Sequence, residues 1–199
     1  MALNVIKKVT TKTKFLARKA KYLDGESRKL LANALVQCHF DYACSSWYSG
    51  LNEKTKGKLQ ICQNKLIRTV LQLPPRSHIN HSHYKQLNWI PVSKRVTQLK
   101  LNHVQAIVNK TSPTYLSTHF TAVNQSHDVN TRSSHSSLTV PRFRTNLGKS
   151  SFRYTGAVEW NKLPTCIKDR TTKCSFKKHV KSHLLNLVYT EENQTFISF

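Results

Sequence analysis

The excess of basic side chains restricts how this chain can fold more than any other feature of its sequence. Its 199 residues include 32 Lys and Arg against 9 Asp and Glu, a formal net charge of +23 with neutral histidines. Charges of one sign repel one another, so this balance disfavours a compact state, and it attracts polyanions. Nucleic acid is the usual polyanion, and an anionic membrane surface comes second.

The basic side chains recur along the chain instead of forming one tail. Residues 1–22 contain seven basic groups and no acid, and residues 51–110 are basic again. From residue 141 onward there are eleven basic groups against four acids. A single disordered basic tail would not give this pattern, so we expect basic surface at several places.

The sequence disfavours most classes of catalytic site. Two-metal nucleotidyl transfer needs clustered carboxylates, whereas the nine acids are scattered and no Asp-Asp pair occurs. The motifs G-x-x-x-x-G-K-[ST], G-x-G-x-x-G and G-x-S-x-G are absent from the sequence. Cys–His catalysis stays open, although nothing local marks a cysteine as activated. We therefore expect no catalytic residue, no cofactor and no small-molecule substrate.

The five cysteines have no regular spacing and do not suggest a disulfide framework. We expect an intracellular protein, nuclear or cytoplasmic, with reduced thiols. The longest apolar stretches are far shorter than the roughly 20 residues of a membrane span, so no membrane contact is predicted.

A zinc site is the sharper alternative for the histidines and cysteines. Cys166, Cys174, His179 and His183 form a Cys…Cys…His-x-x-x-His string, and the two histidines suit one helical face. However, seven residues separate the cysteines, where zinc modules usually have about two to four. His183 also falls beside an apolar face, where a hydrogen-bonded core histidine is the simpler interpretation, and we expect no metal.

Apolar spacing predicts a mainly α-helical fold. Residues 2–22 form a helix with Phe15 among its inward side chains, Asp24 is a plausible N-cap, and the following helix buries Leu30. Residues 121–150, rich in Ser, Thr, Asn and His, predict a long loop with short strands near 138–143 and 151–154. We therefore expect a helical, thumb-like bundle over residues 1–120, followed by a region over residues 121–199 with a polar loop, short strands and a terminal helix.

Residues 52–72 give the clearest amphipathic pattern, at about 100° per residue. The apolar side of this predicted helix contains Leu59, Cys62, Leu66, Ile67 and Val70. Its opposite side contains Lys54, Lys58, Lys65 and Arg68. Lysines on an outer helix face are usually only solvated, but a balanced surface would intersperse Glu, and this helix has only Glu53. We therefore interpret the basic side as a contact for nucleic acid.

Two tryptophans, Trp89 and Trp160, each stand beside Asn and near Pro. Stacking on unpaired bases is one interpretation. Packing at chain reversals is the favoured one.

Several short segments, taken in order and with their spacing, resemble one known family. Examples are HFDYAC at 39–44, LQICQNKLIR at 59–68, LNWIPV at 87–92 and WNKLP at 160–164. Further matching segments are 22–23, 28–31, 34–36, 113–116, 131–132, 140–142, 151–152 and 176–178. The set covers nearly the whole chain, and it resembles the region downstream of the polymerase core in LINE-type (non-LTR) reverse transcriptases of the Jockey-like branch.

This resemblance implies a parent protein with an N-terminal endonuclease and a central reverse transcriptase. The family's catalytic carboxylates lie upstream of every segment present here. A thumb grips a template–primer duplex by its backbone, which requires Lys and Arg and little base readout. Contacts of this kind are predicted for Lys54, Lys58, Lys65, Arg68, Arg132, Arg142, Arg144, Lys177 and Lys178.

The expected function is sequence-independent binding of RNA or RNA–DNA duplex by a non-catalytic region, with the upstream polymerase core as a further partner. Two alternatives stay open at this point. One is a decayed transposon fragment without independent function. The other is a basic protein-interaction module that meets an acidic partner.

Overall fold

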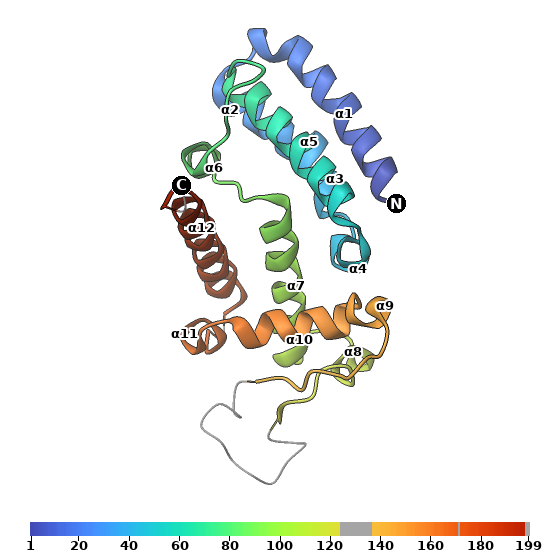
Figure 1. The fold of residues 1–199 in the computed structure, drawn as a ribbon. Helices are drawn as coiled ribbons and strands as arrows, with labels where there is room; N and C mark the ends of the chain where they lie inside the picture. The colour runs from blue at the N-terminus through green and yellow to red at the C-terminus, as the bar shows by residue number, and fades with distance from the viewer. Residues whose placement is uncertain (124–136, 171, 198–199) are drawn as a thin grey trace. The chain divides into compact units, whose positions relative to one another are not determined.

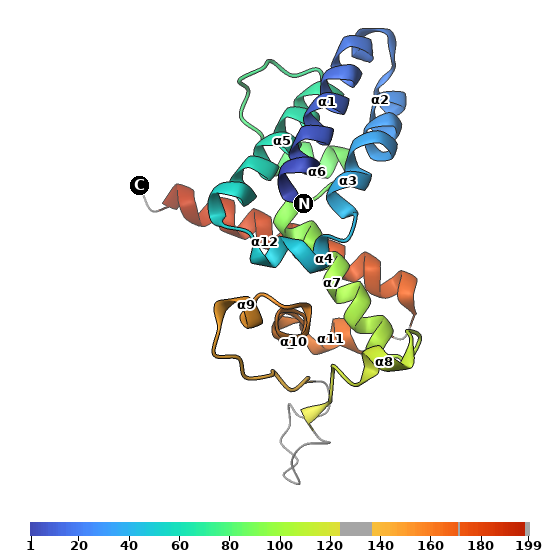
Figure 2. The ribbon, with the colours of Figure 1, turned by 90° about the vertical axis from the view of Figure 1, so that its right-hand side faces the viewer.

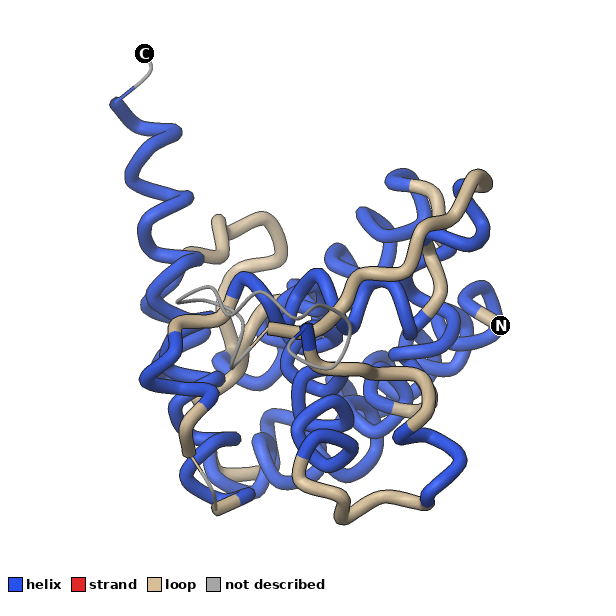
Figure 3. Tube along the Cα trace, turned by 90° about the horizontal axis from the view of Figure 1, so that it is seen from below, coloured by secondary structure: helices blue, strands red, loops and turns tan. Residues whose placement is uncertain are grey.

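Helices form nearly all of the regular structure in the computed structural model, which describes residues 1–123, 137–170 and 172–197 (Figures 1 and 3). This confirms the mainly α class. The described part also contains one isolated antiparallel β-bridge, between Ala122 and Leu138. Within the described residues, no helix is both long enough and apolar enough to cross a membrane.

The chain divides into two compact units. Unit 1 comprises residues 1–96 and 185–199, and unit 2 comprises residues 97–184. The division differs from the predicted ranges 1–120 and 121–199. Phe120 and Trp160, which those ranges separate, belong to the same apolar core in unit 2.

Unit 1 consists of helices joined by short turns. Its α-helices are α1 (Ala2–Lys19), α2 (Gly25–Ala32), α3 (Cys38–Asp41), α4 (Cys44–Trp47), α5 (Glu53–Leu71), α6 (His81–Leu87), the start of α7 (Val92–Val108) and the end of α12 (Lys173–Ile197). Two 3₁₀ turns, at Ala20–Tyr22 and Tyr48–Gly50, and one π-helical turn, at Asn33–Gln37, complete the unit.

Side-chain caps fix where the helices of unit 1 begin. The Oδ2 atom of Asp24 accepts hydrogen bonds from the N–H groups of Glu26 and Ser27, at 3.1 and 3.3 Å. These bonds satisfy donors that a helix N-terminus leaves free, and they confirm Asp24 as the N-cap of α2. Asn52 does the same for α5, because its Oδ1 accepts from the N–H of Thr55 at 2.9 Å.

Helices α1 and α5 pack side by side and run in the same direction (Figures 1 and 2). Thr10 meets Cys62, with 3.8 Å between Oγ1 and Sγ. Ten residues later on each helix, the side-chain amide of Gln72 donates to the carbonyl of Ala20 at 3.2 Å. This parallel pairing places the outer faces of both helices next to each other.

The predicted apolar side of α5 is confirmed, since Leu59, Cys62, Leu66, Ile67 and Val70 are all buried. The inward predictions for Phe15 on α1 and Leu30 on α2 are wrong. Phe15 is 54% exposed and Leu30 is 69% exposed. The buried neighbours are Leu16, about 100° around α1 from Phe15, and Ala32, about 200° around α2 from Leu30.

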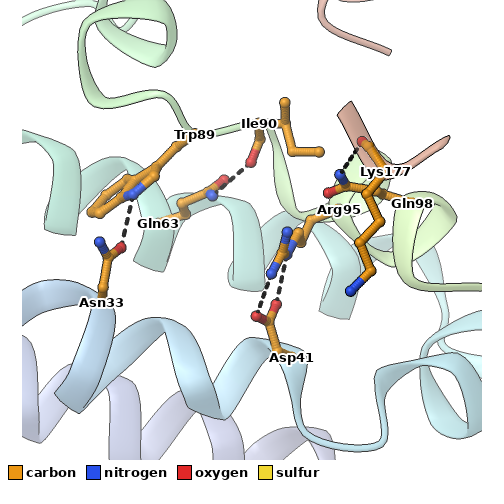
Figure 4. Close-up of polar contacts among 8 residues, drawn as sticks. All are labelled: Asn33, Asp41, Gln63, Trp89, Ile90, Arg95, Gln98 and Lys177. Carbon is orange, nitrogen blue, oxygen red and sulfur yellow. Dashed lines mark hydrogen bonds and ion pairs between the residues drawn. The ribbon is translucent and has the colours of Figure 1, made fainter. Parts of the chain in front are cut away.

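Three polar contacts tie the loop and helix start after α6 to the rest of unit 1 (Figure 4). The indole N–H of Trp89 donates to Asn33 Oδ1 at 2.9 Å, and the amide of buried Gln63 donates to the Ile90 carbonyl at 2.9 Å. Arg95 donates through Nε and Nη2 to both oxygens of Asp41, at 3.0 and 2.7 Å. These bonds offset the desolvation of the groups that they join.

Unit 2 contains the rest of α7 and further helices around one apolar core. These are α8 (Thr114–Ser117), α9 (Asn146–Lys149), α10 (Phe152–Lys162), α11 (Thr165–Lys168) and α12 (Lys173–Ile197) as far as Leu184. In the core, Trp160 stacks on Phe176 with ring centroids 5.9 Å apart. Burial of Trp160 and of Trp89 in unit 1 agrees with the packing interpretation of both tryptophans.

The second predicted strand, near 151–154, is wrong. Ser151 instead caps α10, because its Oγ accepts from the N–H of Tyr154 at 3.3 Å. Hydroxyl side chains favour helix starts in this way. In the first predicted strand, near 138–143, only Leu138 pairs, through its bridge to Ala122.

Candidate nucleic-acid interface

Three lysines line the outer side of α5. Lys54, Lys58 and Lys65 are all exposed, and steps of four and seven residues keep them on one side of the helix. The buried side of α5 lies opposite, so these lysines point away from the core of unit 1. The structure therefore confirms that the three side chains share an accessible face, called here the α5 stripe.

Arg68 continues this face but is only half-buried, because the loop after α5 holds it. Its Nε donates to the carbonyl of Ser77 at 2.9 Å. That bond engages Nε and so restricts how the guanidinium group can turn. A guanidinium that is oriented in advance suits paired hydrogen bonds to a phosphate.

A further cation, absent from the predicted contacts, comes from the turn Ala20–Tyr22 that follows α1. Lys21 lines one groove together with Lys65 and Arg68. The amino acid sequence shows that residues 1–22 are basic and acid-free, but only the parallel pairing of α1 with α5 brings Lys21 to the stripe.

Positive charge also acts on the other side of α1. Partial burial lowers the pKa of His39, and the nearby ammonium groups of Lys12 and Lys8 lower it further. Since like charges disfavour protonation of the ring, His39 reports a positive local potential beside α1.

The acids of residues 1–96 do little to neutralise these surfaces. They are Asp24, Glu26, Asp41 and Glu53. Asp24 caps α2, Asp41 is bound by Arg95, and Glu53 accepts from Lys56 at 2.7 Å. The outer faces of α1 and α5 therefore keep most of their positive charge.

The predicted contacts in unit 2 lie on two separate segments. Arg142 and Arg144 are exposed in the stretch before α9, and Lys177 and Lys178 are exposed on α12. Arg132 lies outside the described residues.

Ring contacts place those two segments at different positions along α10. Phe143 meets Tyr154 near the start of α10, with ring centroids 6.3 Å apart, whereas Phe176 stacks on Trp160 near its end. Six residues of helix separate the two contacts, about 9 Å along its axis. These four predicted cations of unit 2 therefore do not form one row like the α5 stripe.

Lys177 nevertheless contributes to a local positive region in unit 2. The His103 ring packs edge-on against Phe152. This partial burial lowers its pKa, and the charges of Lys173 and Lys177 lower it further. The backbone carbonyl of Lys177 accepts a long bond, 3.4 Å, from Gln98 (Figure 4).

The proposed zinc ligands do not meet within the described residues, where no group of three His, Cys, Asp or Glu side chains is arranged to hold a metal ion. Cys166 and Cys174 are exposed free thiols. His179 Nδ1 lies 2.7 Å from the carbonyl of Ser175. That distance is typical of a hydrogen bond within the helix.

Comparison with known proteins yields no match for the chain among protein-family models, curated proteins or solved structures. The arrangement of its own residues and the sequence resemblance described above are therefore what supports a function.

Proposed function

We propose that this chain binds RNA or an RNA–DNA template–primer duplex, independently of sequence, as a non-catalytic C-terminal region of a LINE-type reverse transcriptase. The observation that carries the binding proposal is the α5 stripe, with Arg68 and Lys21 beside it on two parallel helices. The resemblance of the ordered segments supports the family origin.

The dimensions of the stripe suit a phosphate backbone. Lys54 and Lys65 are separated by about 16 Å along the axis of α5. Phosphates of one strand follow one another about every 3.4 Å along a duplex, so the stripe spans roughly five of them. Flexible ammonium groups at this spacing contact phosphates without reading base edges, which gives binding without sequence preference.

Salt dependence is the signature of such binding. Each neutralised phosphate releases condensed counterions, so affinity falls steeply as salt rises. We expect a log–log salt slope of about −4 or steeper for labelled RNA and for an RNA–DNA hybrid in fluorescence anisotropy. Binding no tighter than that of a scrambled peptide of equal composition would contradict the proposal and favour a decayed fragment.

A charge-reversal variant tests where the nucleic acid binds. The triple variant Lys54→Glu, Lys58→Glu and Lys65→Glu leaves Arg68 and its bond to Ser77 in place. We expect it to weaken binding at least about tenfold and to flatten the salt slope by about three.

The matched control reverses Lys85, Lys149 and Arg170, three exposed cations that belong to neither α1 nor α5. Both triple variants lose the same net charge. An equal loss of affinity in both would mean that overall charge, and not the α5 stripe, determines binding.

Within the proposed parent protein, the catalytic carboxylates belong to the polymerase core, and this chain supplies grip on its substrate. The core is then the protein partner. The parent would act on target sites in the nucleus. It would assemble with RNA in the cytoplasm before it enters the nucleus. No catalytic activity is expected of the chain by itself.

A second candidate is a protein-interaction module. Exposed apolar side chains accompany the cations of α1, its following turn and α2: Leu3 is 70%, Tyr22 73% and Leu30 69% exposed. Such side chains favour a protein contact. Saturable binding to an acidic protein that is lost in Leu30→Ser, together with RNA binding unaffected by the α5 stripe variant, would favour this candidate.

A further inference from the structure

A groove of about 580 Å³ lies between the C-terminal halves of α1 and α5. Its volume falls within the range of small-ligand sites, roughly 300–1,000 Å³. Lys21, Lys65 and Arg68 line it. An isolated phosphate would occupy only a part of this space.

The charges of the groove favour a doubly charged anion. Each helix C-terminus contributes a partial charge of about −0.5, which three cations exceed. A phosphodiester carries a single negative charge, whereas a phosphomonoester carries about −1.5 to −2 near neutral pH. Three cations around one groove therefore match a terminal phosphate better than an internal one.

Two further polar residues, Thr69 and Gln72, line the groove, and the remaining lining residues are apolar. Ala17 and Ala20 come from the α1 side, and Leu73 and Pro75 come from the chain after α5. Such a surface leaves room for the sugar and base that accompany a phosphate. The ligand that combines these features is a nucleotide.

The groove also lies where the α5 stripe ends. Gln72 adopts a left-handed conformation with φ of 54°, and the N–H of Leu73 returns to the carbonyl of Arg68 at 2.9 Å. This is a common way to end a helix and redirect the chain. The redirected segment brings Leu73 and Pro75 into the lining, next to Lys65 of the stripe and Arg68 beside it.

We propose that this groove binds the terminal nucleotide of a nucleic-acid strand through its phosphomonoester group. The inference rests on the proposed function, because the α5 stripe places the strand that ends in the groove. In this arrangement Lys21, Lys65 and the oriented guanidinium of Arg68 surround the terminal phosphate. The apolar side chains contact the nucleoside.

The test uses the full chain and oligonucleotides of one sequence with a 5′-phosphate, with a 3′-phosphate, or with hydroxyl groups at both ends. We expect one phosphorylated form to bind about fivefold more tightly in anisotropy, as several exposed ion pairs acting together would give. Equal affinity for all three would overturn the inference. If the α5 stripe variant still weakened binding, the proposed function would stand.

Two variants locate the preference. Ala17→Leu fills the groove without changing charge, and both residues are strong helix formers. Lys21→Gln removes one cation of the lining. We expect each variant to bring the affinity ratio of phosphate-ended to hydroxyl-ended strand close to one, whereas the control Lys7→Gln, on α1 outside the groove, keeps the ratio. An unchanged ratio in Ala17→Leu and Lys21→Gln would overturn the inference.

Competition identifies the ligand class. A nucleoside monophosphate should displace the phosphate-ended strand better than a phosphorylated peptide of the same net charge. Equal competition by the peptide would overturn the assignment of a nucleotide. Both proposals would fail under two joint results. The chain would bind every oligonucleotide no more tightly than a scrambled peptide does, and the nucleoside monophosphate would leave the NMR spectrum of the chain unchanged.

Discussion

Units 1 and 2 are both helical, but they differ in how helices meet and where charge lies. In unit 1, long helices α1 and α5 lie parallel, and each separates a buried side from an exposed basic side. In unit 2, the elements from α8 to α11 are short or closely packed around Trp160 and Phe176. Long helices with two distinct sides align their cations, and short elements around one core scatter them.

This difference determines which surface is offered as an interface. The cations of the α5 stripe follow from one helix and need no other element to align them. The exposed arginines and lysines of unit 2 come from two segments at different positions along α10. Unit 1 is therefore the better candidate for the proposed binding of a polyanion. The packing of unit 2 is instead dominated by its apolar core.

The core of unit 2 is tested most strongly by Trp160→Ala. Trp160 is 4% exposed and stacks on Phe176, so truncation leaves a large cavity and should cost about 3–5 kcal/mol in unfolding free energy. Urea denaturation followed by circular dichroism measures this cost. Hydrogen exchange should show protection lost first in residues 97–184.

The matched control is Tyr115→Ala, which removes an aromatic side chain that is 68% exposed in the same unit. We expect a change within about 0.5 kcal/mol. Equal loss of protection in both units after Trp160→Ala would mean that they unfold as one, and the comparison would lose its energetic basis.

Among the polar contacts of unit 1, we expect the bidentate pair of Arg95 and Asp41 to contribute most to its stability. Asp41→Asn leaves the guanidinium without its charge partner, and hydrogen bonds to charged groups contribute about 1.5–3 kcal/mol. Because both side chains are about one-third exposed, we expect a cost near the lower limit, measured by urea denaturation.

Glu53→Gln provides the control for that experiment. It removes the charge of a similar pair with Lys56, but Glu53 is 88% exposed. Exposed pairs contribute about 0–1 kcal/mol, so this variant should cost clearly less than Asp41→Asn. The reverse order would show that the pair with Arg95 does not stabilise unit 1.

The sequence was sufficient where one helix alone determines the outcome. The two sides of α5 and the cap at Asp24 follow from local spacing and hydrogen bonding. The predictions for Phe15 and Leu30 fail because buried apolar residues follow closely, Leu16 one position later and Ala32 two positions later. Only the neighbouring helices decide which residue faces the core. The predicted strand at Ser151 fails because a serine after a polar segment suits a helix cap as well as the start of a strand, and sequence alone does not separate the two.

Of the candidate site, the α5 stripe could be predicted and the groove could not. Lys21 meets Lys65 and Arg68 only because α1 runs parallel to α5, a pairing between residues more than forty positions apart. The basic, acid-free composition of α1 was the available signal. Composition gives no direction of packing, so it could not assign a partner to Lys21.

The space around one glycine in each unit shows how tightly the helix that carries it is packed. A Cβ added at Gly57 on α5 meets no atom within 4 Å, whereas one at Gly156 on α10 meets Phe120 and Val104 at 3.1 Å. Alanine within a helix is favoured over glycine by about 0.5–1 kcal/mol. We expect Gly57→Ala to gain this amount and Gly156→Ala to lose most or all of it to crowding, as measured by thermal unfolding. An equal gain at both sites would show that α10 has room to relax.

The smallest expected effect concerns pH and one histidine in each unit. Partial burial lowers the pKa of His39 and of His103 below the ordinary value of 6.5, and nearby lysines lower it further.

The unfolded chain then binds more protons than the folded chain between the folded pKa and about 6.5. The free energy of unfolding therefore rises with pH across that window and is level above it. Urea denaturation at pH 5.5, 6.5 and 7.5 should show the loss on acidification, before most carboxylates titrate. His39→Gln and His103→Gln should each remove part of it, and hydrogen exchange should assign the first part to unit 1 and the second to unit 2. If neither variant reduced the dependence of stability on pH, these rings would not sense the charges of the nearby lysines. The positive potential inferred at α1 and at α12 would then have to be abandoned.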